Sequence, residues 1–287
     1  MTFEYHKPPT LPEALALIAA ESTRFPILAG GTDIVAQWRI GAISPKGLID
    51  ISNLQELEAI TITESHVEIG ALVAHSRIVA NEKIAQIFPA LACACQSVGC
   101  AQIQNMGTIG GNIMNASPAA DVPPVLMVYD TKLLAQNLKG ERWVSADDFF
   151  KEYKKTALEP DELLTKIRIK IPDPSEQTRF YKIGARRAQT ISKVCMCARA
   201  LISHGGIEWA KIAVGSVAPT VVRTLGTEAL LKGKAITTGL LEKARKSLAD
   251  EVKPIDDIRS NADYRRFAAG GLLVRYLREA TKSSASL

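Results

Sequence analysis

Two short segments combine paired glycines with a hydroxyl side chain, a composition suited to close approach of backbone to an anion. In the first, an apolar run ends at Gly30 and Gly31, and Thr32 follows. Glycine accepts positive φ angles, and successive free N–H groups at such a bend can bind phosphate oxygens. An ordinary strand-to-helix turn would have the same composition. The candidate residues are Ile27, Leu28, Ala29, Gly30, Gly31, Thr32, Asp33 and Ile34.

The second segment has the same features, because its glycines permit close approach and its Thr and Asn side chains offer hydrogen bonds. Two such loops suit a diphosphate better than one loop would. The sequence contains neither the G-x-G-x-x-G dinucleotide fingerprint nor a G-x-x-x-x-G-K-[ST] phosphate loop, so a nucleotide here requires another fold. The candidate residues are Thr108, Ile109, Gly110, Gly111 and Asn112.

A run of small residues between Asn115 and Asp121 borders either a ligand or a close backbone contact, because it cannot fill core volume. Asp121 could accept hydrogen bonds from sugar hydroxyls, although an Asp before two prolines is also a common turn residue. Further along, Lys182 with Arg186 and Arg187 offers positive charge near an anion. The alternative for these cations is the solvated edge of a strand.

Other chemistries have little support in the sequence. The four histidines share no metal-ligand spacing, and Cys93, Cys95 and Cys100 are better explained as buried structural thiols than as a cluster site. The sequence has no G-x-S-x-G nucleophile motif and no convincing pair of acid and base carboxylates. We therefore predict neither a catalytic side chain nor a metal site in this chain.

The elements that must position these segments alternate between helix and strand. Thr10 and Glu13 form a capping-box pattern ahead of a helix, and residues 25–29 predict the buried strand that delivers the first glycine pair. Residues 166–171 alternate Lys or Arg with Ile, which predicts a half-buried strand. Pro172-Asp173-Pro174 then marks a domain boundary. Strands and helices are predicted on both sides, so the fold class is α+β in both halves.

Composition limits the remaining possibilities. The 287 residues exceed the usual size of one domain and suggest two. The net charge of +5 is spread along the chain, which argues against a nucleic-acid partner. No apolar run approaches the roughly 18 residues that span a bilayer, and the N-terminus lacks the features of a secretion signal. Five cysteines cannot all pair within one chain, so we expect a cytoplasmic protein.

Taken in order, these segments resemble those of the FAD-binding subunits of the xanthine dehydrogenase and carbon monoxide dehydrogenase family of molybdenum hydroxylases. The resemblance covers nearly the whole chain at plausible spacing. It implies a PCMH-type FAD-binding domain over residues 1–173, with subdomains of about 1–55 and 56–173, and a smaller α+β C-terminal domain over 178–282. The matching residues are 29–33, 102–105, 108–112, 116–121, 182–187 and 254–259.

The resemblance also implies a binding site. In the family the two glycine loops hold the FAD diphosphate, and by position they correspond to residues 27–34 and 108–112. The family's Asp after the small-residue run binds polyol or ribose hydroxyls and matches Asp121, and its Lys beside the flavin matches Lys182. Either Leu163 or Leu164 is implied as a contact of the flavin or the adenine, and we take Leu164 as the candidate.

Two positions depart from the family pattern. Gln104 stands where many members have Arg or Lys, which puts an anion contact there in doubt. Thr32 stands where some members have His, and its presence fits FAD that is bound without a covalent link.

The function implied by the resemblance is electron transfer through FAD. Electrons would come from the [2Fe–2S] clusters of an iron–sulfur subunit that accompanies a molybdopterin-binding large subunit, and would pass to NAD+ or another acceptor. Two alternatives remain at this stage, a stand-alone FAD-dependent reductase and a flavin-free assembly protein.

Overall fold

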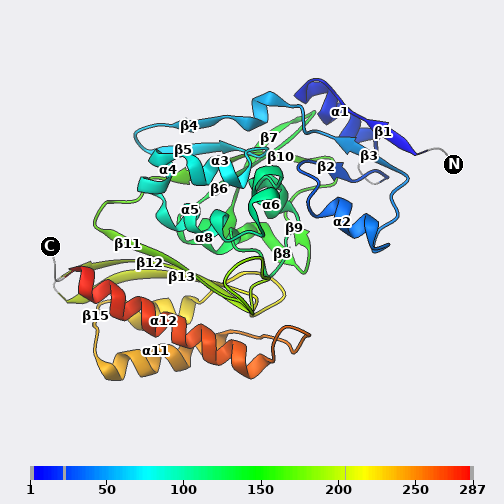
Figure 1. Cartoon of the computed structure of the whole chain (residues 1–287). Helices are drawn as coiled ribbons and strands as arrows, with labels where there is room; N and C mark the ends of the chain where they lie inside the picture. The colour runs from blue at the N-terminus through cyan, green and yellow to red at the C-terminus, as the bar shows by residue number, and fades with distance from the viewer. Residues whose placement is uncertain (1–2, 22–23, 204, 285–287) are drawn as a thin grey trace.

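The computed structural model describes residues 3–21, 24–203 and 205–284 (Figure 1). The chain begins with a small parallel sheet of strand order β1-β3-β2, against which the first helix packs. Thr10 and Glu13 are hydrogen-bonded at the start of that helix, as the capping-box pattern predicts. The elements are β1 (Glu4–His6), α1 (Leu11–Glu21), β2 (Ile27–Leu28), α2 (Ile34–Arg39) and β3 (Gly47–Asp50).

The next region is an antiparallel sheet of order β4-β5-β10-β6-β7, with helices α3–α8 beside it. The alternating segment forms β10, in which Ile167 and Ile169 are fully buried. On the opposite face Lys166 and Arg168 pair with Glu68, so the predicted half-buried strand is confirmed. The strands are β4 (Ile60–Ile62), β5 (His66–Gly70), β6 (Lys132–Asn137), β7 (Gly140–Ser145) and β10 (Leu163–Lys170).

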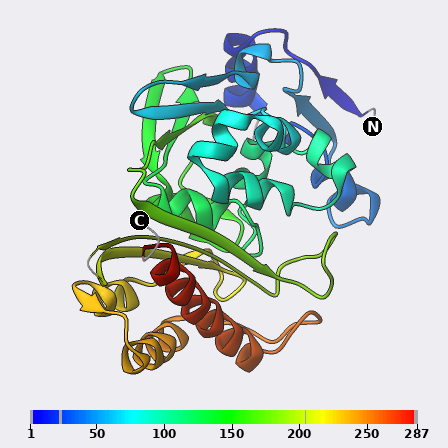
Figure 2. The same ribbon diagram turned by 60° about the vertical axis from the view of Figure 1, so that its left-hand side comes forward.

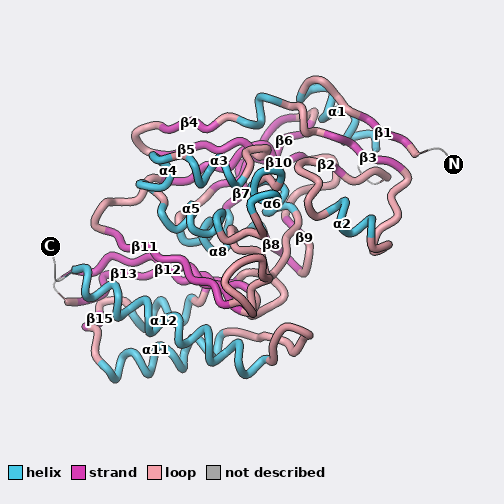
Figure 3. The backbone as a smooth tube through the Cα atoms, in the orientation of Figure 1, coloured by secondary structure: helices cyan, strands magenta, loops and turns pink. Residues whose placement is uncertain are grey.

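Short helices dominate this region, and most were not predicted, because six residues are too few to show a helical period (Figure 3). A 3-10 turn (Gln55–Glu58) leads into the sheet, and a two-stranded hairpin of β8 (Phe150–Glu152) and β9 (Lys155–Thr156) lies at its edge. The helices are α3 (His75–Ala80), α4 (Glu82–Ile87), α5 (Pro89–Gln96), α6 (Ala101–Met106), α7 (Ile109–Met114), α8 (Pro123–Val128) and α9 (Ala146–Phe149).

The C-terminal region is a second antiparallel sheet that lies between helices on both sides (Figure 2). Val194, Met196 and Ala198 pack with α11 and α12, whereas Cys195 and Cys197 pack with the core that contains α5 and α8. The elements are β11 (Glu176–Ile183), β12 (Val194–Ser203), β13 (Gly206–Gly215), β14 (Val222–Arg223), α10 (Leu225–Leu231), β15 (Lys234–Ala235), α11 (Thr238–Glu251) and α12 (Ala262–Ser284). The predicted α+β class is thereby confirmed in both halves.

Candidate cofactor-binding site

The two glycine-rich segments lie against each other. A Cβ atom added to Gly30 would lie 1.8 Å from the carbonyl oxygen of Met106, and one added to Gly107 would lie 3.3 Å from the Thr32 hydroxyl oxygen. Any side chain at position 30 would therefore force the segments apart. The structure brings residues 29–34, which we call the first loop, into contact with residues 106–112, the second loop.

The first loop keeps its backbone N–H groups free. The strand predicted over 25–29 is only two residues long, since Pro26 has no N–H to donate to the sheet. Gly31 has a φ of +72°, a left-handed conformation that glycine adopts readily, just before α2. Within the described part of the chain, the N–H groups of residues 30–34 donate to no acceptor. Consecutive unpaired N–H groups around a left-handed residue form a concave site for an anion.

The second loop uses its N–H groups inside the protein. Ile109 donates to the Val73 carbonyl at 2.9 Å and Gly110 to the Ala71 carbonyl at 2.9 Å, while Gly111 donates to the Thr108 hydroxyl at 3.0 Å. A Cβ atom on Gly110 would lie 2.6 Å from the Ala71 oxygen. The composition of this loop suggested that its backbone approaches a ligand, but at Gly110 it approaches another part of the chain instead.

Both loops border a cavity of about 630 Å³. A second cavity of about 370 Å³ adjoins it and shares the lining residues Pro26, Ile27, Ala29, Gly111 and Met114. These volumes lie in the range of cofactor pockets. The predicted residues that line the larger cavity are Ile27, Ala29, Gly30, Gly31, Thr32, Asp33, Ile34, Thr108, Gly111 and Asn112.

The smaller cavity is more apolar and includes Leu163 and Leu164, together with Gly110. Two other predicted residues of the loops, Leu28 and Ile109, line neither cavity, and Ile109 is fully buried. The C-terminal region reaches the larger cavity through Ile191, in the segment between β11 and β12. The joined cavities thus have an apolar end and a polar end near the first loop.

Two buried polar atoms at the larger cavity have no hydrogen-bond partner among the described residues, namely Oδ1 of Asn112 and Nδ1 of His75. Buried polar groups in folded proteins are usually paired, so such atoms indicate a missing partner. A nucleotide cofactor in the cavity could supply one, and the residues present therefore fit such a group. In the sequence, the histidines could be judged only by their spacing as metal ligands, and nothing in the pattern marked His75 as buried.

Asp121 and Lys182 form an ion pair with each other, and neither of them lines the two cavities. The Lys182 ammonium lies 2.5 Å from Asp121 and also donates to the Ser97 carbonyl at 2.9 Å. The Ser192 hydroxyl donates to the other Asp121 oxygen at 2.6 Å. Burial raises the pKa of Asp121, and the ammonium of Lys182 opposes this. Nothing in the sequence pattern indicated this pair.

The small-residue run before Asp121 lies against the C-terminal sheet. Ser216 donates its N–H to the Pro118 carbonyl at 2.7 Å, and the Cys195 thiol lies 3.6 Å from the Ala120 carbonyl. Of the two explanations for this run, a close backbone contact is therefore the one observed. Gln104 is also structural, because its amide donates to the Gln96 and Val98 carbonyls at 2.7 and 3.0 Å.

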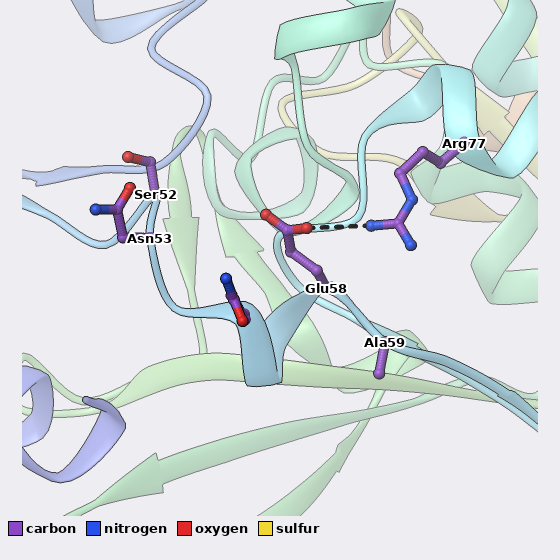
Figure 4. Close-up of a pocket in the computed structure, with 6 residues that line it drawn as sticks. Ser52, Asn53, Glu58, Ala59 and Arg77 are labelled. Atoms are coloured by element: carbon purple, nitrogen blue, oxygen red, sulfur yellow. Dashed lines mark hydrogen bonds and ion pairs between the residues drawn. The ribbon is translucent and has the colours of Figure 1, made fainter. Parts of the chain in front are cut away.

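A separate polar pocket of about 590 Å³ is lined by residues that follow β3 and by Arg77 of α3 (Figure 4). Glu58 and Arg77 face each other across it at 3.2 Å, with Ser52 and Asn53 nearby. Both charged side chains are about half exposed. Within the described ranges, no group of three metal-ligating side chains occurs, and no helix is long and apolar enough to cross a membrane.

Two family descriptions match the chain in succession. Residues 1–174 match the FAD binding domain in molybdopterin dehydrogenase, and residues 179–280 match the CO dehydrogenase flavoprotein C-terminal domain. Both glycine loops lie within the first match, and the β11–β13 sheet with α11 and most of α12 lies within or close to the second.

Curated relatives and solved structures match over almost the full length. The carbon monoxide dehydrogenase medium chain of Hydrogenophaga pseudoflava is 30% identical, covering 97% of this chain and 96% of its own. The xanthine dehydrogenase FAD-binding subunit of Escherichia coli O157:H7 is 30% identical over 91% of this chain and 90% of its own. A structure of carbon monoxide dehydrogenase from H. pseudoflava superposes with a TM-score of 0.93 at 30% identity, covering 98% and 97% of the two chains.

Proposed function

Because the chain belongs to the family of FAD-binding medium subunits of molybdenum hydroxylases, we propose that it transfers electrons through FAD within a larger complex. The matches confirm the resemblance seen in the sequence and FAD as the cofactor. One observation carries the proposal, the cavity whose wall holds the free N–H groups of the first loop and two unpaired polar atoms.

Different residues of the chain would bind different parts of the cofactor. The N–H groups of residues 30–34 and the Thr32 hydroxyl would bind the diphosphate, because they are donors without partners among the described residues and belong to residues that line the cavity. Leu163 and Leu164 would pack against a flat ring in the smaller cavity. Asn112 would bond a donor on the cofactor through its unpaired Oδ1.

Asp121 and Lys182 have a different proposed role from the one the family implies for each alone. Their charges largely cancel, because the ammonium and the carboxylate are 2.5 Å apart and Asp121 is buried. The pair would act as a fixed dipole that joins the C-terminal sheet to the small-residue run. Any stabilisation of reduced flavin by Lys182 would then be weaker than that of an isolated cation.

Bound FAD would accept electrons singly and release them in pairs. We propose a [2Fe–2S] subunit as the donor and a molybdopterin-binding large subunit as the site of substrate oxidation, with NAD+ or another compound as acceptor. The names of the relatives as medium chains support the subunit assignment. We also propose domains of 1–173 and 178–282, supported by the family matches, and a cytoplasmic location, supported by five free thiols.

Reconstitution tests this proposal. The purified chain should carry FAD, release it on acid precipitation, and show no turnover with purines, aldehydes or N-heterocycles until the partner subunits are added. Substrate-dependent flavin reduction by the chain alone would favour a stand-alone reductase. A colourless chain that cannot bind added FAD would favour an assembly protein.

A further inference from the structure

His75 lies where the two glycine loops meet. It is the first residue of α3, and its backbone N–H donates to the Gly107 carbonyl at 3.0 Å, which ties α3 to the second loop. The side chain is 1% exposed and still lines the larger cavity. The ring therefore occupies the wall of the cofactor cavity rather than the interior of the core.

The imidazole has unused hydrogen-bonding capacity. Nδ1 is buried and has no hydrogen-bond partner among the described residues. A neutral imidazole carries one donor and one acceptor, and leaving either unpaired in a buried place costs free energy. Burial lowers the pKa of His75 to about 4, so the ring is neutral at physiological pH. A group that enters the cavity can remove this cost by pairing with the ring.

The surroundings of the ring indicate what that group is. At the point where Gly107 would carry a Cβ atom, the Thr32 hydroxyl oxygen is 3.3 Å away and Cδ2 of His75 is 3.4 Å away. The free N–H groups of the first loop adjoin Thr32. Among the described residues that line the larger cavity, none is Lys or Arg. Uncharged hydrogen-bond donors that have no acceptor among the described residues therefore lie close together near Thr32 and His75. Such a group of donors suits an oxygen-rich anion.

We propose that His75 is a further cofactor-binding residue, whose imidazole N–H donates to a diphosphate oxygen of FAD beside the Thr32 hydroxyl. This inference rests on the proposed FAD site and adds a residue from outside both glycine loops.

The test compares binding of FAD and of ADP to apoprotein variants, measured by calorimetry or flavin fluorescence quenching. ADP contains the diphosphate without the flavin. His75→Leu should weaken both ligands about 10- to 100-fold, the effect of losing a hydrogen bond to a charged group. His75→Asn keeps an amide near the Nδ1 position and His75→Gln keeps one near Nε2, so one of the two should bind within about threefold of the original protein.

Thermal unfolding of the same apoproteins separates binding from structure. His75→Leu should leave the apoprotein midpoint unchanged or higher, because it removes an unpaired polar atom, while the upward shift caused by FAD becomes smaller. Ile78→Val, a fully buried change on the same helix, controls for altered packing of α3 and should not change the affinity of the folded protein.

The outcomes are distinct. Equal FAD affinity of His75→Leu and the original protein would overturn the inference, and so would a loss for FAD without a loss for ADP, which would move the contact to the flavin half. Weak binding by both amide variants would also overturn it, even if His75→Leu does not fold. If the original protein binds no FAD, the proposed function fails first.

Discussion

The two glycine loops share a composition and differ in what their backbone does. The first loop leaves the N–H groups of residues 30–34 free beside a cavity, whereas the second commits those of Ile109, Gly110 and Gly111 to carbonyl and hydroxyl oxygens of the protein. We propose that the first loop binds an anion with its backbone. The second loop packs against the first loop, and it borders the cavity with side chains rather than with free backbone N–H groups.

This difference shows that a glycine pair has two separate uses. Gly31 supplies a positive φ, while the missing side chains of Gly30 and Gly110 allow two stretches of chain to touch. A motif alone cannot distinguish these uses, because both require glycine. The direction of the absent Cβ atom and the partners of the N–H groups distinguish them.

The contact between the loops should be most sensitive at Gly30. Gly30→Ala would place a Cβ atom 1.8 Å from a backbone oxygen that cannot rotate away, so we expect a loss of about 4 kcal/mol in the free energy of unfolding and of most FAD binding. Denaturant unfolding and flavin content measure both. Gly271→Ala is the control, since nothing lies within 4 Å of its Cβ position in α12, and it should be neutral or stabilising. Equal stability of the two variants would show that the loops are not in contact.

A pH titration tests the junction of the loops at His75. Because the pKa of His75 falls from 6.5 to about 4 on folding, its neutral form stabilises the apoprotein above pH 6.5, and this contribution is lost as pH falls toward 4. The full loss is roughly 3 kcal/mol. Denaturant unfolding should therefore show that the original apoprotein loses roughly 3 kcal/mol more stability than His75→Asn between pH 6.5 and pH 4. Parallel curves would mean that the ring is not buried at the junction.

The sequence was sufficient for features that depend on local pattern. Thr10 with Glu13 predicted a helix start, and the alternation in residues 166–171 predicted which face of β10 is buried, because both signals are contained within a few residues. The resemblance located both loops. The pairing of Lys182 with Asp121 could not be predicted, because the two are 61 residues apart and only tertiary packing joins them.

The use of the second loop's N–H groups could not be predicted for the same reason. Their acceptors, the carbonyls of Ala71 and Val73, belong to the segment that leads from β5 into α3. His75 follows directly on that segment, and its burial depends on how the segment packs beneath the second loop. A pattern in one segment carries no information about which distant backbone atoms will lie against it.

The contrast between the loops can be measured with one substitution in each. Gly110→Ala should cost about 2 kcal/mol of stability, because its Cβ atom would meet the Ala71 backbone, yet leave the FAD affinity of the folded protein within about threefold. Gly31→Ala should cost only about 1 kcal/mol, from strain at positive φ, yet lower FAD affinity more than about tenfold by disturbing the free N–H groups. Unfolding and calorimetric binding give both quantities. If Gly110→Ala kept its stability and lost FAD, the second loop would be approaching the ligand itself.

The smallest effect on FAD affinity is expected for a substitution at Arg77. A further small cavity there is lined by Arg77 and Glu58 together with Gly30 and Thr108, so a cation lies near the loops although it does not line the larger cavity. Arg77 and Glu58 are about half exposed and paired at 3.2 Å, and such pairs contribute about 0.5 kcal/mol. Arg77→Gln should thus change FAD affinity less than about twofold. Glu58→Gln is the matched variant, because it frees the guanidinium. Tighter FAD binding by Glu58→Gln and weaker binding by Arg77→Gln would place the diphosphate on the Arg77 side, and would reverse the assignment of which face of the first loop binds the anion.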